Sequence, residues 1–214
     1  MNISEIFCSI NGESSMSGLR TVFIRTFACP LRCSYCDSLY AVEGDDFKIM
    51  SVPDIIAEVE KYDCKRVTLT GGEPMIQADA FDLIKELTGE GYSVEIETSG
   101  AVDLKPLKDL MLDHCIVTMD WKCPSSEMRD RMFESNLDVL DYDDVLKFVV
   151  GSQEDLDEVG KIKDRTNAQI FVSPVFGKIE LRDIAERIIN EGWNNVRLQL
   201  QLHKFCWDPD KRGV

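Results

Sequence analysis

Segments that favour β-strands and segments that favour α-helices alternate along this chain, and this alternation limits the fold more than any other feature. Runs of β-branched and bulky apolar residues predict the strands, and apolar residues on one helical face predict the helices. The expected strands cover residues 21–27, 66–70, 92–97, 115–119, 145–150, 169–172 and 195–200, and the expected helices cover 53–62, 78–90, 104–112, 153–166 and 179–191. A βα unit therefore repeats about six times, which predicts a parallel sheet covered by helices.

Chain length decides between two folds of this kind. A full eight-unit barrel takes about 250 residues, whereas this chain has 214, and residues 121–141 are expected to be irregular or weakly helical. We therefore predict an α/β fold in the form of a partial, open β/α barrel of about six βα units, with a doubly wound sheet as the alternative. Since no internal repeat, linker or low-complexity tract is visible, we expect a single domain over residues 1–214.

Five short runs of chemically distinctive residues each follow an expected strand directly. Active sites of both candidate folds lie at the carboxyl ends of the strands, so we expect all five runs on one face of the molecule. The runs are residues 29–36 (CPLRCSYC), 71–74 (GGEP), 97–100 (ETSG), 120–122 (DWK) and 173–174 (SP).

The first run contains Cys29, Cys33 and Cys36 in a C-x3-C-x2-C spacing. A closed iron–sulfur cluster or structural zinc site takes four ligands, so three thiolates leave one metal position open. Zinc knuckles usually come as paired C-x2-C units, and a second pair is absent here. The spacing therefore favours an iron–sulfur cluster over zinc or redox-active thiols. The nearest other thiol, Cys8, could supply a fourth ligand only if the chain folds back.

The other cysteines and the charge balance give weaker expectations. Cys8, Cys64, Cys115, Cys123 and Cys206 lack ligand spacing among themselves, so we expect them to be buried small hydrophobes. The formal charge of −15 argues against a nucleic-acid partner, because phosphate binding needs clustered Lys and Arg. No apolar run of 18 or more residues and no basic leader followed by an apolar stretch is present, so we expect no membrane partner and a cytoplasmic location.

The remaining motifs each have an ordinary structural interpretation beside a functional one. The Gly71-Gly72 pair allows close approach of a ligand and Glu73 can accept from an ammonium group, but the same residues also form common β-to-α turns. Residues 97–100 could be a turn with a hydroxyl cap, Asp37-Ser38 a helix cap, and residues 11–13 a polar turn.

Taken together, the motifs resemble a known family. C-x3-C-x2-C after the first expected strand is the signature of the radical S-adenosylmethionine (SAM) enzymes. From about Ile6 to the C-terminus, the other runs resemble the 7-carboxy-7-deazaguanine synthase family of the queuosine pathway. These runs are residues 10–13 (INGE), 23–25 (FIR), 36–38 (CDS), 71–74 (GGEP), 97–100 (ETSG), 201–204 (QLHK) and 211–214 (KRGV). The cysteine spacing indicates only the superfamily; the N-terminal run, Asp37-Ser38 and the C-terminal run indicate the family.

The resemblance implies a radical SAM lyase that converts 6-carboxy-5,6,7,8-tetrahydropterin to 7-carboxy-7-deazaguanine with loss of ammonia, within purine metabolism. It implies a [4Fe-4S] cluster, SAM and Mg²⁺ as cofactors. A 5′-deoxyadenosyl radical from SAM would take hydrogen from the carbon that bears the carboxylate, and SAM would be regenerated after ring contraction. We also expect a flavodoxin- or ferredoxin-type electron donor and a homodimer.

The resemblance also assigns roles to residues. Cys29, Cys33 and Cys36 would be the catalytic cluster ligands, and Ser38, where the family usually has Thr, would bind Mg²⁺. The residues expected to bind SAM are Tyr35, Cys36, Asp37, Gly72, Glu73, Gly100, Asp120, Trp121, Lys122, Ser173, Pro174, Val175 and Phe176. The residues expected to bind the pterin are Ile10, Asn11, Gly12, Glu13, Arg25, Thr98 and His203.

For some of these positions there is a physical reason for the expected role, and at others this chain differs from the residue that is usual in the family. Glu13 could accept two N–H groups side by side, and Arg25 alternates with apolar strand residues, so it needs a partner, either Glu13 or a substrate carboxylate. Asn11 and Ser173 stand where the family usually has Gln, and Asp120-Trp121 stands where it usually has Ser-Pro.

Two other functions stay open at this point. Another radical SAM enzyme, such as a glycyl-radical activase, would not need residues 11–13 or Asp37-Ser38 and would need a surface for docking a protein. A non-enzymatic iron–sulfur or zinc module would need a fourth ligand near the three cysteines.

Overall fold

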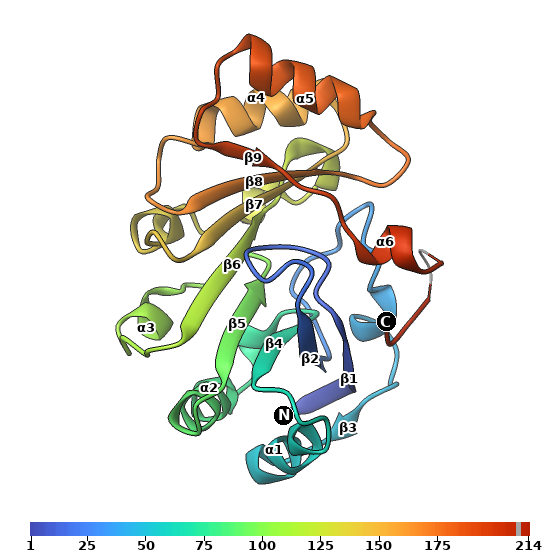
Figure 1. The fold of residues 1–214 in the computed structure, drawn as a ribbon, viewed down its shortest axis with the longest axis vertical. Helices are drawn as coiled ribbons and strands as arrows, with labels where there is room; N and C mark the ends of the chain where they lie inside the picture. The colour runs from blue at the N-terminus through green and yellow to red at the C-terminus, as the bar shows by residue number, and fades with distance from the viewer. Residues whose placement is uncertain (209–210) are drawn as a thin grey trace.

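The structure is a computed structural model that describes residues 1–208 and 211–214. Its strands form one nine-stranded sheet in the order β3-β1-β2-β4-β5-β6-β7-β8-β9 (Figure 1). Seven of them run parallel: β2 (Arg20–Thr26), β4 (Arg66–Gly71), β5 (Ser93–Thr98), β6 (Cys115–Trp121), β7 (Val145–Val150), β8 (Gln169–Pro174) and β9 (Val196–Leu198). The parallel strands follow one another in chain order without a switch point, and the two edge strands β3 and β9 do not pair. The open β/α barrel is therefore confirmed, and the doubly wound alternative is wrong.

Two antiparallel strands at the first edge were not predicted. They are β1 (Asn2–Ile10), which pairs with β2, and β3 (Lys48–Ile49), which pairs with β1. The pairing of β1 with β2 shifts register between Ile3 and Glu5. Such a bulge interrupts the two-residue period, which is the signal that sequence patterns use to find a strand.

Most helices form a layer outside the fan of strands, while α6 lies on the other side beside the C-terminus (Figure 1). The outer helices are α1 (Val52–Glu60), α2 (Ala80–Gly89), α3 (Lys105–Lys108), α4 (Gln153–Ile162) and α5 (Leu181–Asn190), and α6 spans His203–Cys206. Short 3-10 helices span Leu39–Ala41, Pro74–Ile76, Pro124–Ser126, Arg129–Arg131 and Glu134–Asp138. The last three lie in the stretch expected to be irregular. No helix in the described residues is long and apolar enough to span a membrane.

Local sequence explains where several helices begin and end. The hydroxyl of Ser51 accepts from the backbone N–H of Asp54 at 3.3 Å, which caps α1. Gly91 follows α2 with a φ of +78°, a left-handed conformation that glycine adopts without strain. Helix α3 is shorter than the expected 104–112, because Met111 already has a φ of +48° and the chain has turned away.

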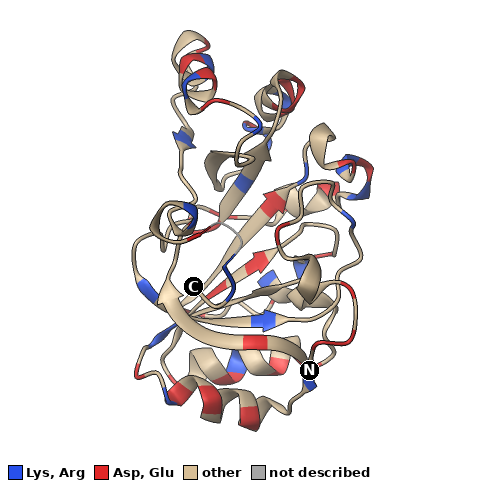
Figure 2. Ribbon diagram, turned by 90° about the vertical axis from the view of Figure 1, so that its right-hand side faces the viewer, with Lys and Arg blue, Asp and Glu red and all other residues tan. Residues whose placement is uncertain are grey.

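The two faces of the parallel sheet have different chemistry. Alternate strand residues such as Val67, Ile96 and Phe148 are fully buried and pack against the helices, forming the hydrophobic core. The residues between them face the inside of the barrel, and several are charged; Figure 2 shows acidic and basic stretches on the strands themselves. The barrel interior is thus a polar space that suits a polar ligand.

Candidate active site

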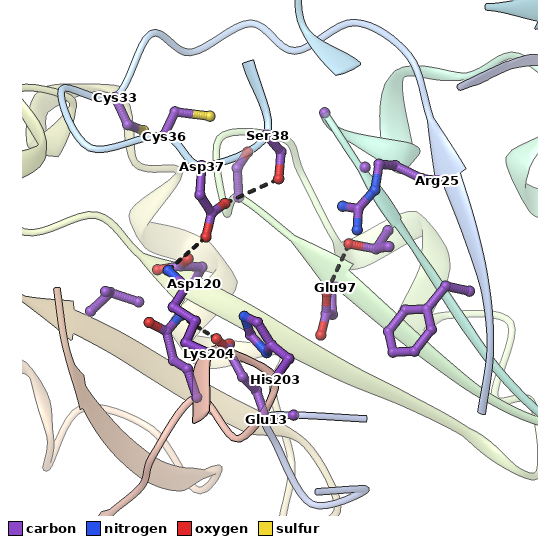
Figure 3. A pocket seen from close by; sticks show the side chains of 18 of the residues that line it. Glu13, Arg25, Cys33, Cys36, Asp37, Ser38, Glu97, Asp120, His203 and Lys204 are labelled. Carbon is purple, nitrogen blue, oxygen red and sulfur yellow. Dashed lines mark hydrogen bonds and ion pairs between the residues drawn. The ribbon is translucent and has the colours of Figure 1, made fainter. Parts of the chain in front are cut away.

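One cavity of about 280 Å³ opens at the carboxyl ends of the parallel strands (Figure 3). Four of the five runs that follow expected strands contribute lining residues directly, and the fifth contributes Val175 and Phe176, which come immediately after it. The prediction that these runs share one face is therefore confirmed. The loop after β1 and the last part of the chain complete the wall.

The cysteine loop forms one end of the cavity. Cys29, Cys33 and Cys36 are all half-buried, line the cavity and are not in disulfides. Burial raises the pKa of each thiol, and the nearby Lys122 ammonium acts in the opposite direction on all three. Three thiols that line one end of a cavity with Lys122 form a donor set whose chemistry suits a cluster with one open iron.

The Gly71-Gly72 pair packs the end of β4 against the backbone that leads into the cysteine loop. The Gly72 N–H donates to the Thr26 carbonyl at 3.0 Å, and the Glu73 N–H donates to the Ala28 carbonyl at 2.9 Å. A Cβ on Gly72 would lie 2.0 Å from the Ala28 oxygen. The two glycines are therefore needed because this turn approaches the protein's own backbone closely.

The Glu73 carboxylate is fully buried, and its hydrogen bonds are made within the protein. It accepts from the Met75 N–H at 3.0 Å, from the Thr98 hydroxyl at 2.9 Å and from the Ser99 N–H at 2.7 Å. Glu73 thereby joins the end of β4 to the end of β5. It lies directly behind Gly72 and Thr98, which line the cavity.

Residues 120–122 at the end of β6 alternate between the two sides of the sheet, and the two charged ones face the cavity. The Lys122 ammonium donates to Asp120 Oδ2 at 2.8 Å, and both residues line the cavity. Asp120 Oδ1 is buried and has no hydrogen-bond partner in the described residues. Between them, Trp121 points to the other side of the sheet, where it is fully buried and its ring N–H donates to Glu158 at 3.3 Å.

The loop after β1 is fixed by the floor of the barrel. The Asn11 amide donates to Glu95 at 2.7 Å and to the Thr68 hydroxyl at 3.2 Å, while its oxygen accepts from the Glu13 N–H at 3.0 Å. All three side-chain contacts of Asn11 are thus made within the protein. They hold Glu13 at the cavity wall.

The Glu13 carboxylate is buried between two donors that are distant in sequence. It accepts from the Lys147 ammonium and from the Gln201 amide. Burial acts to raise the pKa of Glu13, but the Lys147 charge and hydrogen bond outweigh it and lower the pKa. His203 lies against the same loop, because a Cβ on Gly12 would be 2.2 Å from His203 Nδ1.

Asp37 and Ser38 lie between the cysteines and the last part of the chain (Figure 3). The Ser38 hydroxyl donates to Asp37 Oδ1 at 3.0 Å, and Lys204 pairs with Asp37 Oδ2 at 2.9 Å. Desolvation by the surrounding protein acts to raise the pKa of Asp37, but the charge and hydrogen bond of Lys204 outweigh this effect and lower the pKa to about 2. These side chains present ionised carboxylate and hydroxyl oxygens to the cavity.

Within the protein, Arg25 pairs with a different residue from the one that we expected. Its Nε donates to Glu5 at 2.8 Å, so the prediction of a Glu13 partner is wrong. Glu5 is the register neighbour of Arg25 across β1 and β2, and it also accepts from the Tyr40 hydroxyl at 2.8 Å. Arg25 still lines the cavity.

The expected site residues therefore gather around one cavity, with a few exceptions. Those that do not line it are Glu73, Gly100, Trp121, Ser173 and Pro174. Ser173 is fully buried on β8, and its hydroxyl has no partner in the described residues. Tyr35 lines the cavity and donates to the Val149 carbonyl at 3.1 Å.

The remaining cysteines do not line the cavity. Cys8 pairs in register with Val22 and is close to Arg20 and Cys64, at the amino end of β2 and thus opposite the cysteine loop. Cys123 is buried as expected, while Cys8, Cys64 and Cys115 are only half-buried. Cys206 is exposed, so its expected burial is wrong. Helix α6 is a single turn beside the cavity and has too little packed surface to cover that side chain.

Several residues that shape the cavity were assigned no role from the sequence, although Glu97 and Gln201 lie in runs quoted above. Lys147, Glu97 and Gln201 line it, and Glu95 lies beneath it. The sequence signal that could have identified such residues is a charged residue within an otherwise apolar strand, as in Val145-Leu146-Lys147-Phe148. Such a charge must face a polar interior or pair with an opposite charge.

Comparison with known proteins agrees with this geometry. Residues 23–148 match the family described as "Radical SAM superfamily". The chain therefore belongs to the radical SAM superfamily, whose cofactors are a [4Fe-4S] cluster and SAM. Relatives named 7-carboxy-7-deazaguanine synthase match the chain over its length. The relative from Clostridium acetobutylicum is 40% identical, covering 99% of this chain and 98% of its own, and that from Koribacter versatilis is 36% identical, covering both chains fully. Within the superfamily, the chain belongs to the 7-carboxy-7-deazaguanine synthase family.

Solved structures share the fold. The crystal structure of QueE from Escherichia coli has a TM-score of 0.74 at 24% identity and covers 93% of this chain and 92% of its own. Streptococcus suis SuiB bound to S-adenosylmethionine has a TM-score of 0.59 at 13% identity, over 83% of this chain and 45% of its own. Both likenesses agree with an open β/α barrel.

Proposed function

We propose that this chain is a radical SAM lyase that converts 6-carboxy-5,6,7,8-tetrahydropterin to 7-carboxy-7-deazaguanine with loss of ammonia, in queuosine synthesis. The observation that carries the proposal is the set of residues that line the cavity at the strand ends. Three thiols lie at one end, and Glu13 and Arg25 line the same space, in a chain of the 7-carboxy-7-deazaguanine synthase family.

The residues present fit a cluster and SAM. Cys29, Cys33 and Cys36 would ligate three irons and leave one open for SAM, and the cavity side of Asp120 and Lys122 offers hydrogen-bond partners nearby. When bound, the cluster and SAM supply a 5′-deoxyadenosyl radical. The protein's part is to hold the substrate carbon against that end of the cavity and to exclude water.

The substrate would lie between the cysteine loop and the loop after β1. The Arg25 guanidinium can bind the substrate carboxylate, and Glu13 can accept paired N–H groups from the pyrimidine ring of the pterin. The Thr98 hydroxyl and His203 line the same space. The Asn11 amide already bonds Glu95 and Thr68, so its contribution would come through the position of the loop.

A magnesium ion would lie at Ser38. Oxygen ligands suit this hard cation, and the Ser38 hydroxyl and the Asp37 carboxylate both face the cavity. An ion here would be close to the carboxylate of the substrate and would bias the rearrangement. We also propose a single domain, a homodimer, a cytoplasmic location and a flavodoxin- or ferredoxin-type electron donor.

Anaerobic reconstitution tests the proposal. We expect about four irons per chain, cleavage of SAM on reduction and magnesium-dependent formation of 7-carboxy-7-deazaguanine. Cys33→Ala should lose the cluster absorbance, whereas Cys206→Ala, which changes an exposed thiol, should keep it. Zinc without cluster absorbance would contradict the radical chemistry. SAM cleavage with no deazaguanine product would instead favour another radical SAM reaction.

A further inference from the structure

Lys147 is a buried cation in the middle of an otherwise apolar strand. It lies on the inner face of β7, only 8% of its surface is exposed, and it lines the cavity. A Lys ammonium is almost never buried unless an opposite charge accompanies it. The partners of this ammonium therefore indicate why it is there.

Those partners are carboxylates from two separate parts of the chain. The Lys147 ammonium donates to Glu13 on the loop after β1, and Asp120 Oδ2 on β6 lies 3.8 Å away. Burial acts to lower the pKa of Lys147, but the nearby carboxylates Glu13, Asp120 and Glu97 raise it well above its ordinary value. Lys147 is thus charged, and it is centred among carboxylates.

Without this cation, the surroundings of Glu13 would oppose its charge. Its other hydrogen-bond donor is the neutral Gln201 amide. The charged or titratable groups that face the pair are Asp120 on β6, Glu97 on β5, His203 on α6 and Lys122, which follows β6 and is itself paired with Asp120 at 2.8 Å. Lys122 is thus engaged by Asp120, and among the described side chains Glu13 bonds only Lys147 and Gln201. Without Lys147, a buried Glu13 would therefore tend to take up a proton or turn away.

We infer that Lys147 is a positioning residue, which holds the Glu13 carboxylate in the orientation that accepts the paired N–H groups of the substrate. The inference rests on the proposed function, in which Glu13 recognises the pterin. It assigns Lys147 no contact with the reacting atoms. The expected signature is therefore weaker substrate binding, with the steps that do not involve substrate left intact.

Lys147→Met removes the charge and keeps a similar length. We expect KM for the carboxypterin, and the dissociation constant measured without reductant, to rise about tenfold or more at pH 7, with a smaller change in kcat. The rise should shrink at higher pH, because Glu13 regains its charge there. Glu13→Gln should also raise KM, but without this pH dependence.

A double-mutant cycle isolates the coupling of the two residues. If Lys147 acts through Glu13, the double variant Glu13→Gln/Lys147→Met should bind substrate about as weakly as Glu13→Gln alone. Lys61→Met, which removes an exposed cation on the outer side, should match the unchanged protein. Cluster absorbance and SAM cleavage without substrate report folding in every variant.

The outcomes separate the two hypotheses. No deazaguanine product from the unchanged protein would contradict the proposed function. Three results would overturn the role of Lys147: normal turnover with an unchanged KM in Lys147→Met, a rise in KM that is equal at all pH values, or fully additive effects in the cycle.

If Lys147→Met does not fold, Lys147→Arg is measured instead, because it retains the cation. Its KM should stay within a few-fold of that of the unchanged protein. A KM as high as that of Glu13→Gln would overturn the role of Lys147.

Discussion

At the scale of single residues, the floor of the cavity is organised by the Glu95 carboxylate. It is fully buried and accepts hydrogen bonds from the Asn11 amide at 2.7 Å, the Thr118 hydroxyl at 2.7 Å and the Thr68 hydroxyl at 3.1 Å, as well as from the Ser14 hydroxyl. No cation is among these partners. Burial, and next the charge of Glu97, raise the pKa of Glu95 to about 7.

This shift predicts a pH dependence of stability. The folded protein holds the Glu95 proton up to about pH 7, whereas the unfolded chain releases it near pH 4.3, so unfolding is favoured as pH rises between these values. Glu95→Gln cannot ionise, and its amide can donate to the Ser14 and Thr118 hydroxyls. Relative to the variant, the unchanged protein should lose about 2 to 3 kcal/mol of unfolding free energy between pH 5 and pH 8, measured by urea denaturation.

Glu86→Gln on the exposed face of α2 is the matched control and should leave the pH slope unchanged. An identical slope in the Glu95→Gln variant and the unchanged protein would show that Glu95 does not hold its proton in the folded state.

The sequence identified single residues of the cavity better than their partners. Motifs pointed to Glu13 and Arg25, and both line the cavity. Their partners Lys147 and Glu5 were missed, because a two-residue period tells which face a side chain occupies and not which distant side chain meets it. Glu13 and Lys147 are 134 positions apart in the sequence.

At the scale of elements, the end of β4 supports the cysteine loop. The N–H groups of Gly72 and Glu73 donate to the carbonyls of Thr26 and Ala28, just before Cys29. Gly71 has a φ of +129°, which residues with a side chain rarely adopt. The position of the first thiol thus depends on two residues that have no side chain.

Gly72→Ala should therefore disturb the cysteine loop. The added methyl would lie 2.0 Å from the Ala28 oxygen, so the backbone must shift, at a cost of about 1–3 kcal/mol typical of overpacking. We expect a lower thermal midpoint and less iron bound after reconstitution. Gly89→Ala at the end of α2 meets no atom within 4 Å and should be neutral or slightly stabilising. Equal iron content in both variants would contradict this role for Gly72.

The elements themselves were predictable where periodicity is strong. Strand β7 was predicted with its observed bounds, and the longer helices within a few residues. Among the exceptions are β1, where a bulge breaks the period, and α6, which is one turn long and so shows no helical repeat. Both of these elements border the cavity.

At the scale of the whole molecule, the barrel stays open between its edge strands, and the segment after β9 reaches across to the loop after β1. Gln199 makes two hydrogen bonds with the backbone of Ser14: its oxygen accepts from the N–H at 2.8 Å and its amide donates to the carbonyl at 2.9 Å. The Leu202 N–H donates to the Gly12 carbonyl at 3.0 Å. The order of the strands follows from the βα repeat, but this bridge does not, because it joins positions 185 apart.

Gln199→Ala should loosen the bridge while leaving the cysteine end intact. The loss of two hydrogen bonds to a part-buried backbone should destabilise the protein by about 1–3 kcal/mol. Amide hydrogen exchange at residues 12–14 should speed up, and substrate affinity should fall, because Glu13 lies on the same loop. Iron content and SAM cleavage without substrate should not change. Gln169→Ala, whose amide donates to the Tyr142 carbonyl at 3.3 Å, is the matched control. Unaltered exchange at residues 12–14 in Gln199→Ala would mean that the loop after β1 is held by the barrel floor alone.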